Sequence, residues 1–535
     1  MGLNRTMSGL VLATLVAGAV GCHRDEAPRS RRIFVLLNED SNHFMVNHIW
    51  GSRRNVPMQV ADILEYVDQY LRPPVTHFFV NVNGNTLPYD TNVGERCWDV
   101  HAAVGCTCLQ SPISEDLWKR GIDPYAIMIA RAREKKISPW LSMRMNDVHN
   151  ATESNTCSMS MFWRKHPQFR RCPDALVRSG SGGWSRFCYD YSHPEVRKLM
   201  LDEAEEMLGR YDVDGIEFDW MRWPTHLTPG KEQEQKGCLT DFMRQARQLA
   251  NVSAVTRGHP VRVAVRVHSN PDEALGLGTD VFSWAREGFV DLVVPCNFLT
   301  ACDFELPLAE WRRRISVENP RVKVVPGTDA FVHPEQSNWK NSTPLTAAEL
   351  RGFLDRMYRE GAVGFYFFNH FEHNRSQEVG HYLSEPGLID KDKIVGLTRA
   401  YPVSYRESTC AGTKEHSGVQ FPCLLNERVK IRIAAGTVPA SGSCSVRVGF
   451  GEEEPSERLL TTIRLNGILA IGHSHVDVGV WPGRGSMSVA SVEFAFPVTA
   501  LRDGLNELEL GGVDGELSKA FACELYVKCE EGAAP

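Results

Sequence analysis

Residues 211–224, which read YDVDGIEFDWMRWP, decide the fold class. Successive side chains of a β-strand point to opposite faces, so the apolar Ile216 and Phe218 share one face. Glu217 and Asp219 share the other. The apolar face suits a covering layer of helices, and the acids then face the interior of a parallel β-barrel, with Asp219 at the carboxyl rim and Glu217 one layer deeper. Because a buried carboxylate is costly without a partner, two acids in one buried strand predict a functional site.

Seven further strand-like runs flank this one in the chain, most of them followed by an amphipathic helical pattern. Alternating strands and helices predict an α/β fold with a parallel sheet, and eight strands suit a closed (β/α)₈ barrel of the TIM type better than an open sheet. The expected strands cover 33–38, 76–82, 137–145, 213–220, 261–268, 290–297, 322–326 and 362–368, with helical patterns such as 58–71, 123–135, 194–211 and 347–360 between them.

Two long insertions, 83–117 and 146–191, each follow a strand and are rich in cysteine and aromatic residues. Loops after strands lie at the carboxyl rim of a barrel, so we expect both to wall a substrate cleft. Disulfides are expected to pin these loops, although the sequence leaves their connectivity open. The candidate pairs are Cys97 with Cys106 or Cys108, Cys157 with Cys172 or Cys188, and Cys296 with Cys302.

No metal site and no organic cofactor are predicted. The Cys106 and Cys108 pair lacks CxxC spacing, and no second cysteine pair stands at zinc-finger distance. Barrel amidohydrolases need His-x-His at the end of the first strand, where this chain has Asn-His pairs at 42–43 and 47–48. Residues 180–183 do not follow a strand as a serine-hydrolase elbow requires, and a phosphate-binding glycine loop is absent.

From residue 396 the pattern changes to short alternating strands separated by turns, which predicts an all-β sandwich over 396–535 after a barrel over 32–395. The formal net charge of −7 on 535 residues supplies no basic surplus to neutralise phosphates, so nucleic acid is not an expected partner. Runs of like charge are short and fit solvated helix faces.

The N-terminus predicts export. A positive start and an apolar run from Leu10 to Val20 form a signal peptide over 1–21, too short to span a bilayer. The run ends in Ala-Val-Gly before Cys22, which resembles the lipobox of bacterial lipoproteins, although Ala19 stands where Leu is more usual. Lipidation of Cys22, with a tether over 22–31, would anchor the protein to the cell envelope, in the outer membrane or periplasm. An ordinary secretory signal is the alternative.

The strand around Asp219 carries a family resemblance. The segment DGIEFDWMRWP is similar to the bacterial glycosyl-hydrolase-like barrels whose fourth strand reads DGIHLDxxRYP, and residues 162–167 (FWRKHP) resemble the W…HPEW segment that precedes that strand. In related glycosidases an Asp that ends strand four is often the nucleophile, so the resemblance implies this role for Asp219. Glu217 stands where His is often found. Residues 501–510 (LRDGLNELEL) resemble an edge of jelly-roll modules attached to glycosidases.

Glycoside hydrolysis normally needs a second carboxyl group. We rank Asp329 and Asp303 first, because strands six and seven lie across the barrel from strand four. Arg266 is expected to approach Glu217, His268 to lie near Asp219, and both to be candidates for substrate binding. Further acids near strand ends are Glu39, Asp40, Asp147 and Glu305, and other rim residues suited to sugar recognition are Asn38, His43, Arg144, Asn297, Asn369, His370, Trp184, Trp220, Arg222 and Trp223.

Together these patterns predict an exported glycoside hydrolase that acts on a poly- or oligosaccharide, with catalytic candidates Asp219, Asp329, Asp303 and Glu217. The alternative is a surface lipoprotein that binds glycan through a degenerate, non-catalytic barrel. A second carboxylate facing Asp219 across an open cleft would distinguish the two.

Overall fold

The computed structural model describes residues 33–172, 181–297, 302–333, 343–370, 387–404, 421–450, 455–476, 490–513 and 518–529. The predicted signal peptide, the tether and Cys22 lie outside these residues. Among the described helices, none combines the length and the apolar character needed to cross a membrane.

Nine parallel strands form one sheet in the order β7-β6-β5-β4-β3-β2-β1-β11-β8. The sheet closes, because β7 and β8 at its two ends are consecutive pieces of one chain segment: Val325 N donates to the Val293 carbonyl on one side, and Tyr366 N donates to the Pro326 carbonyl on the other. The strands are β1 (Phe34–Glu39), β2 (His77–Asn81), β3 (Ser138–Arg144), β4 (Gly215–Asp219), β5 (Arg262–His268), β6 (Leu292–Cys296), β7 (Lys323–Val324), β8 (Gly327–Thr328) and β11 (Gly364–Phe367).

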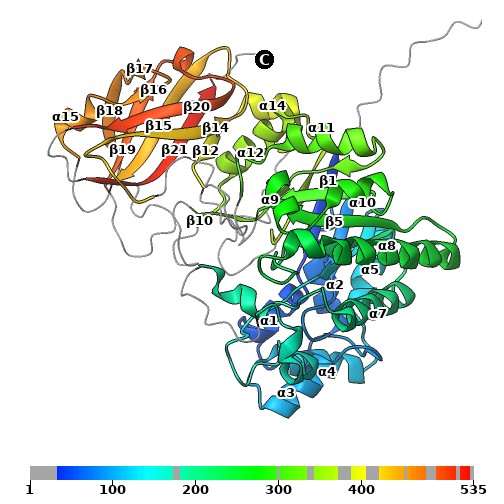
Figure 1. Cartoon of the computed structure of the whole chain (residues 1–535). Coiled ribbons are helices and arrows are strands. Elements are labelled where there is room, and N and C mark those ends of the chain that lie inside the picture. Colours follow the sequence, from blue (N-terminus) through cyan, green and yellow to red (C-terminus); the bar gives the residue numbers. More distant parts are fainter. Residues whose placement is uncertain are drawn as a thin grey trace, which may run out of the picture. The chain divides into compact units, whose positions relative to one another are not determined.

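Helices alternate with these strands (Figure 1). The larger ones are α2 (Val60–Asp68), α5 (Pro124–Glu134), α7 (Pro194–Arg210), α8 (Glu232–Arg257), α11 (Leu308–Glu318) and α12 (Ala347–Arg359). The insertions add α3 (Cys97–Val104), α4 (Gln110–Lys119) and α6 (Met161–Lys165). Shorter helices are α1 (Val46–Ile49), α9 (Pro271–Gly276), α10 (Val281–Arg286) and α14 (Lys391–Val395). The remaining short elements are the 3-10 turns η1 (His43–Met45), η2 (Pro167–Phe169) and η3 (Ser181–Phe187), and the antiparallel pair β9 (Phe331–Val332) and β10 (Thr343–Pro344).

Local sequence explains where several helices begin. Asp123 caps α5 by accepting from the backbone amides of Tyr125 and Ala126, both at 3.0 Å. Thr346 and Glu349 form a capping box at the start of α12. These caps satisfy backbone donors that have no partner within a helix.

Apolar side chains fill part of the barrel interior. A buried cluster contains side chains contributed by most strands: Leu36, Phe79, Trp140, Ala264, Leu292, Val294, Val325, Tyr366 and Phe368. A β-carbon built on Gly215 would meet the Trp140 ring at 2.4 Å, so only glycine leaves room for this indole.

After the barrel come two antiparallel sheets, of six and four strands. Strands β12 (Arg399–Pro402), β13 (Cys423–Leu424), β15 (Gly442–Phe450), β18 (Gly472–Val476), β19 (Ser491–Phe496) and β21 (Lys519–Cys529) form one, and β14 (Arg428–Ala435), β16 (Arg464–Leu465), β17 (Ile468–Leu469) and β20 (Gly504–Gly511) form the other, with α15 (Glu457–Leu460) and η5 (Val498–Ala500) between strands. The predicted fold class, a TIM-type barrel followed by an all-β region, is therefore confirmed. The jelly-roll resemblance and the boundary at 395/396 stay predictions.

Asp355 of α12 ties the barrel to the chain that follows it. This carboxylate is 2% exposed and accepts from the Tyr401 hydroxyl at 2.8 Å and the Thr437 backbone amide at 2.8 Å. It also pairs with the Arg399 guanidinium, which is 0% exposed. The contact is a buried ion pair with its remaining lone pairs satisfied.

The predicted disulfides are not formed. All thirteen cysteines within the described residues are free thiols. The Cys108 thiol lies against Cys157 of the other insertion, at 3.1 Å between sulfurs, rather than joining Cys97. That distance exceeds the covalent length of about 2.05 Å. For the cysteines of the two insertions, sequence spacing pointed to partners within the same insertion, whereas the fold brings Cys108 and Cys157 of different insertions together.

Candidate active site

Asp219 ends β4 and is 1% exposed. Its Oδ1 accepts from Arg266 Nε and from the backbone amides of Met221 and Arg222, each at 2.9 Å. Its Oδ2 accepts from Arg266 Nη2, also at 2.9 Å. A bidentate guanidinium and two amides stabilise the ionised carboxylate. Because Oδ2 has a single donor among the described residues, it is the oxygen with lone-pair capacity left for a ligand.

Glu217 lies on the same face of β4, one layer deeper, and is 0% exposed. Its Oε1 accepts from the Ser142 hydroxyl at 2.7 Å and the Tyr366 hydroxyl at 2.8 Å. Burial, and then the negative charge of Asp219, raise the pKa of Glu217 to about 8. Burial therefore favours the protonated form of Glu217, one layer beneath the Asp219 carboxylate.

Arg266 makes its direct contacts with Asp219 instead of Glu217, and the expected place of His268 near Asp219 stays a prediction. Arg266 forms its ion pair with Asp219, and its charge only moderates the raised pKa of Glu217. His268 Nε2 lies 3.0 Å from a Glu273 carboxylate oxygen on α9. The difference for Arg266 follows from strand register, because Asp219 pairs laterally with Arg266, whereas Glu217 pairs with an alanine.

Asp329 follows β8 and is 2% exposed. The negative charges of Asp329 and Asp219 both act on the Arg222 guanidinium, whose pKa burial lowers and these acids partly restore. Both charges also act on the Cys296 thiol. The structure therefore brings Asp329 and Asp219 to the same end of the barrel, next to the same two groups.

Asp303, the other candidate acid, has different surroundings. It is 2% exposed and accepts from the backbone amide of Glu305 in its own loop at 2.9 Å. Its charge acts on the Cys302 thiol. Of the two candidate partners, Asp329 is the one that shares its neighbours with Asp219.

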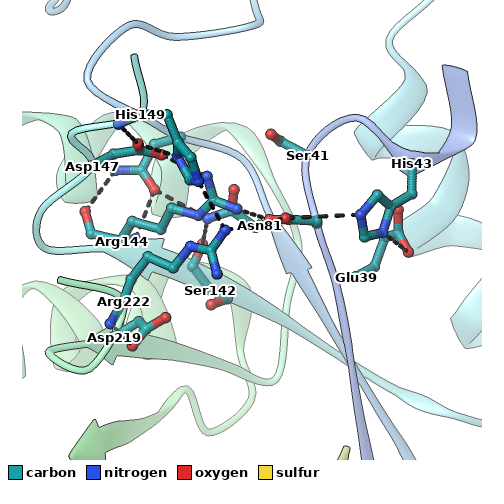
Figure 2. A network of polar contacts seen from close by, with 12 residues as sticks. Glu39, Ser41, His43, Asn81, Ser142, Arg144, Asp147, His149, Asp219 and Arg222 are labelled. Atoms are coloured by element: carbon teal, nitrogen blue, oxygen red, sulfur yellow. Dashed lines mark hydrogen bonds and ion pairs between the residues drawn. The ribbon is translucent and has the colours of Figure 1, made fainter. Parts of the chain in front are cut away.

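A chain of ion pairs occupies the rim above β1 and β3 (Figure 2). Arg144 Nη1 donates to Asp147 Oδ2 at 2.6 Å, and Arg144 Nη2 pairs with Asp40. Asp147 Oδ1 lies 2.6 Å from His149 Nδ1, and His149 Nε2 lies 3.2 Å from Arg222 Nη2. We call these five residues, Asp40, Arg144, Asp147, His149 and Arg222, the rim network.

The charges of the rim network are set by burial and by mutual contact. Burial lowers the pKa of Arg144 to about 10, and the positive charge of Arg222 acts in the same direction. Burial alone would raise the pKa of Asp147, but His149 and Arg144 outweigh it and hold that pKa below its usual range. Asp147 is therefore held as an anion.

The network continues along β1 through His43 (Figure 2). Its two ring nitrogens lie 3.9 Å from Glu39 Oε2 and 3.9 Å from Asp40 Oδ2. Glu39 also accepts from the Tyr66 hydroxyl at 2.9 Å, and burial raises the pKa of Glu39 well above its ordinary value. Asp40 thus contacts both His43 and Arg144.

The rim network lines a cavity of about 260 Å³. Both insertions contribute to its walls, through residues such as Gly84 and Cys157. The volume is near the lower end of the roughly 300–1,000 Å³ typical of small-molecule sites. The strand-four acids do not line the cavity, and Arg222 lies between: its side chain faces the cavity while its backbone amide binds Asp219.

Buried amides stand at two further strand ends. Asn38 of β1 and Asn297 after β6 are 1% and 2% exposed, and neither side chain has a hydrogen-bond partner among the described residues. Buried polar groups in proteins are nearly always satisfied, so such amides favour a polar ligand. Asn369 lies at the end of β11 with φ of 55°, and burial lowers the pKa of the adjacent His370 to about 3.

Aromatic side chains surround the outer part of the site. The Trp223 ring lies edge-on to His149, with centroids 5.2 Å apart, and to Trp184, also at 5.2 Å. Trp220 is 1% exposed and packs beneath the rim. Trp223 is thus placed near the cavity, and Trp220 is a packing residue.

Sequence reasoning missed Ser142 and Tyr366, the two hydroxyl donors to Glu217. A signal was present, because both occupy inward positions in the alternation of their strands. It also treated Arg144 and Asp147 as independent rim residues, although Arg144 joins Asp147 to Asp40.

Comparison with known proteins gives one family match. The model of the family described as "Glycosyl hydrolase-like 10" matches residues 84–245. The matched segment runs from the end of β2 into α8 and contains β3, β4 and both strand-four acids. No curated protein matches the sequence.

Several solved structures are similar. The glycoside hydrolase domain of PgaB (BpsB) from Bordetella bronchiseptica is 10% identical, with 65% of this chain and 98% of that chain covered and a TM-score of 0.41. A family GH18 chitinase from Chromobacterium violaceum is 10% identical over 94% of this chain and 90% of that chain, with a TM-score of 0.38. A cycloisomaltooligosaccharide glucanotransferase from Paenibacillus sp. is 9% identical over 92% of this chain, with a TM-score of 0.35. This chain spans 57% of the glucanotransferase and 52% of a Paenibacillus chitinase, ChiW.

Proposed function

We propose that the protein is a glycoside hydrolase whose substrate binds at the carboxyl rim of the barrel, beside Arg222. The observation that carries this proposal is Asp219, a buried carboxylate paired with Arg266 through both of its oxygens, one of which has a single donor among the described residues. The family match over the same strand supports it, as do the amides of Asn38 and Asn297, which have no hydrogen-bond partner within the described part of the chain.

In the proposed mechanism, Asp219 Oδ2 attacks or electrostatically stabilises the anomeric carbon as positive charge develops there. Asp329 donates a proton to the leaving oxygen as the glycosidic C–O bond breaks, and water then completes the hydrolysis. Glu217, protonated beneath Asp219, holds no charge that would repel the ionised carboxylate. Arg144 and Arg222 bind sugar hydroxyl groups in the cavity.

A non-catalytic, glycan-binding barrel is the second candidate. Both oxygens of Asp219 are engaged, and the side chain is 1% exposed, which favours a structural role for this carboxylate. In that case the cavity and the rim network would bind sugar without cleaving it.

The deciding experiment screens the purified protein against a panel of polysaccharides, alongside Asp219→Asn, Asp329→Asn and Asp303→Asn. The first two variants are expected to lose roughly 10²–10⁴-fold in kcat. Asp303→Asn is the matched control and should stay within a few-fold of the wild type. Wild-type activity in Asp219→Asn would reject its catalytic role. Glycan binding without turnover, in a folded wild-type protein, would support the second candidate.

We also propose that the protein is exported and anchored through a lipid on Cys22, on the basis of the lipobox-like segment alone. Replacement of Cys22 by Ser is expected to release the protein from the membrane fraction. Globomycin-insensitive processing of the wild type would instead indicate an ordinary secretory signal.

A further inference from the structure

Three cysteines and one histidine converge beside the cavity. The potential ligand atoms of His101, Cys106, Cys108 and Cys157 all lie within 4.8 Å of one another. Cys157 is 6% exposed, and the other three are partly buried. The cluster takes no part in the proposed hydrolysis.

The spacing of these atoms suits tetrahedral coordination. With Zn–S bonds of about 2.3 Å and Zn–N of about 2.0–2.1 Å, tetrahedral angles place sulfurs about 3.8 Å apart and a sulfur about 3.5 Å from a nitrogen. The Cys108 sulfur lies 3.7 Å from His101 Nδ1 and 3.1 Å from the Cys157 sulfur. Shifts of well under 1 Å would bring both distances to these values.

The ligand set identifies the class of ion. Three thiolates and one imidazole form a soft, closed Cys₃His shell, which is typical of structural Zn²⁺. We infer that this cluster is a structural zinc site. On binding, each of the three thiols releases its proton, and His101 binds through a neutral ring nitrogen.

The position of the site suggests what the metal does. His101, Cys106 and Cys108 belong to the insertion after β2, whereas Cys157 belongs to the insertion after β3. Both insertions line the cavity, and Cys157 itself is a lining residue. A metal at this point crosslinks the two cavity walls, a task that the sequence analysis assigned to disulfides.

The competing occupant of the cluster is a Cys108–Cys157 disulfide. Such a bond would leave His101 and Cys106 with no common role, whereas a metal uses all four groups. It is nevertheless the natural outcome in an oxidising compartment, and the experiment must therefore distinguish the two.

The test uses the full-length chain, purified without chelator or added reductant, and measures metal by mass spectrometry together with the disulfides by non-reducing peptide mapping. We expect about one Zn²⁺ per chain and free thiols at all three cysteines. Replacing the metal with Co²⁺ should give thiolate-to-cobalt charge-transfer bands and the intense visible bands of a tetrahedral site. Cys108→Ser and Cys157→Ser should each lose most of the metal.

Cys238→Ser is the matched control, because Cys238 is a partly buried cysteine of α8 outside the cluster; it should keep its metal. Circular dichroism shows whether each variant is folded. If a cysteine variant does not fold, the metal content and the cobalt spectrum of the wild type still decide. A Cys108–Cys157 disulfide, or less than about 0.1 metal ion per chain together with no cobalt bands, would overturn the inference.

Discussion

Glu217 is a carboxylic acid in a place where a carboxylate cannot be solvated. Two hydroxyl groups donate to one of its oxygens, and the ionised Asp219 lies on the same face of the strand. The protein interior therefore favours the neutral acid. Ionisation of this buried residue should therefore change the stability of the protein with pH.

The pH dependence of the free energy of unfolding should reveal that Glu217 is neutral in the folded protein. The pKa of Glu217 is about 8 in the folded protein and has its ordinary value near 4.5 when unfolded. Unfolding therefore releases a proton between these values. The contribution of Glu217 to the free energy of unfolding is complete below pH 4.5 and is lost as the pH rises through 8. The loss is up to about 1.4 kcal/mol per pH unit. Glu217→Gln, neutral at every pH, should flatten this part of the profile in thermal unfolding.

The matched control is Glu205→Gln, which makes the same change at an exposed position on α7. Its profile should follow that of the wild type. Equal slopes for Glu217→Gln and the wild type between pH 5 and pH 8 would contradict the assignment of a neutral acid.

For individual residues, the face of the strand to which a side chain points was predictable, but the residues that it contacts were not. Alternation correctly turned Glu217 and Asp219 inward, because it depends on a single strand. The partner of Arg266 depends on the register between β4 and β5, which a single sequence does not contain. The identity of the second acid depends on loops after β6 and β8, where short-range patterns carry no distance information.

Among the elements, β4 shows how closely a barrel strand is fitted to its neighbour. Gly215 has no side chain, and the Trp140 ring of β3 fills the space where one would lie. A methyl group here would displace an indole packed in the apolar cluster.

Gly215→Ala is therefore expected to destabilise the protein by about 1–3 kcal/mol. Gly209→Ala, in the last turns of α7 with no atom within 4 Å of its β-carbon, should instead stabilise it by about 0.5–1 kcal/mol. Urea denaturation measures the free energy of unfolding of both variants. A stabilised Gly215→Ala would show that Trp140 has another position available.

All eight predicted strand segments coincide with strands of the barrel, because each is an apolar run bounded by turn residues. The seventh was predicted over 322–326, where the structure has β7, and a further short strand, β8, follows directly at 327–328. β7 pairs with β6, whereas β8 pairs with β11. The insertions were expected as cavity walls and do line the cavity. Their crosslink was not predictable, because its ligands come from both insertions and match no standard spacing.

For the whole molecule, the buried pair of Asp355 and Arg399 joins the barrel to the chain beyond it. The described residues from Phe34 onward form a single compact unit by their contacts. We therefore expect them to unfold together.

Asp355→Ala would leave the Arg399 guanidinium buried without its anion, and should lower the free energy of unfolding by about 3–5 kcal/mol. Arg359→Ala is the matched control on the same helix, because it removes the exposed pair with Asp503 and should cost no more than about 1 kcal/mol. Guanidinium denaturation measures the free energy of unfolding of both variants. Equal effects of the two variants would contradict a dominant role for the buried pair.

The barrel can close only after its last strand has been synthesised. Phe34 in the first strand pairs with Gly364 in the last. At a synthesis rate of about 5–20 residues per second, roughly 15–70 s separate the appearance of these two residues on the ribosome. During that interval β1 has one of its two neighbours at most, and its open edge can pair with other chains. A chaperone that shields this edge is therefore expected to raise the yield of the folded protein.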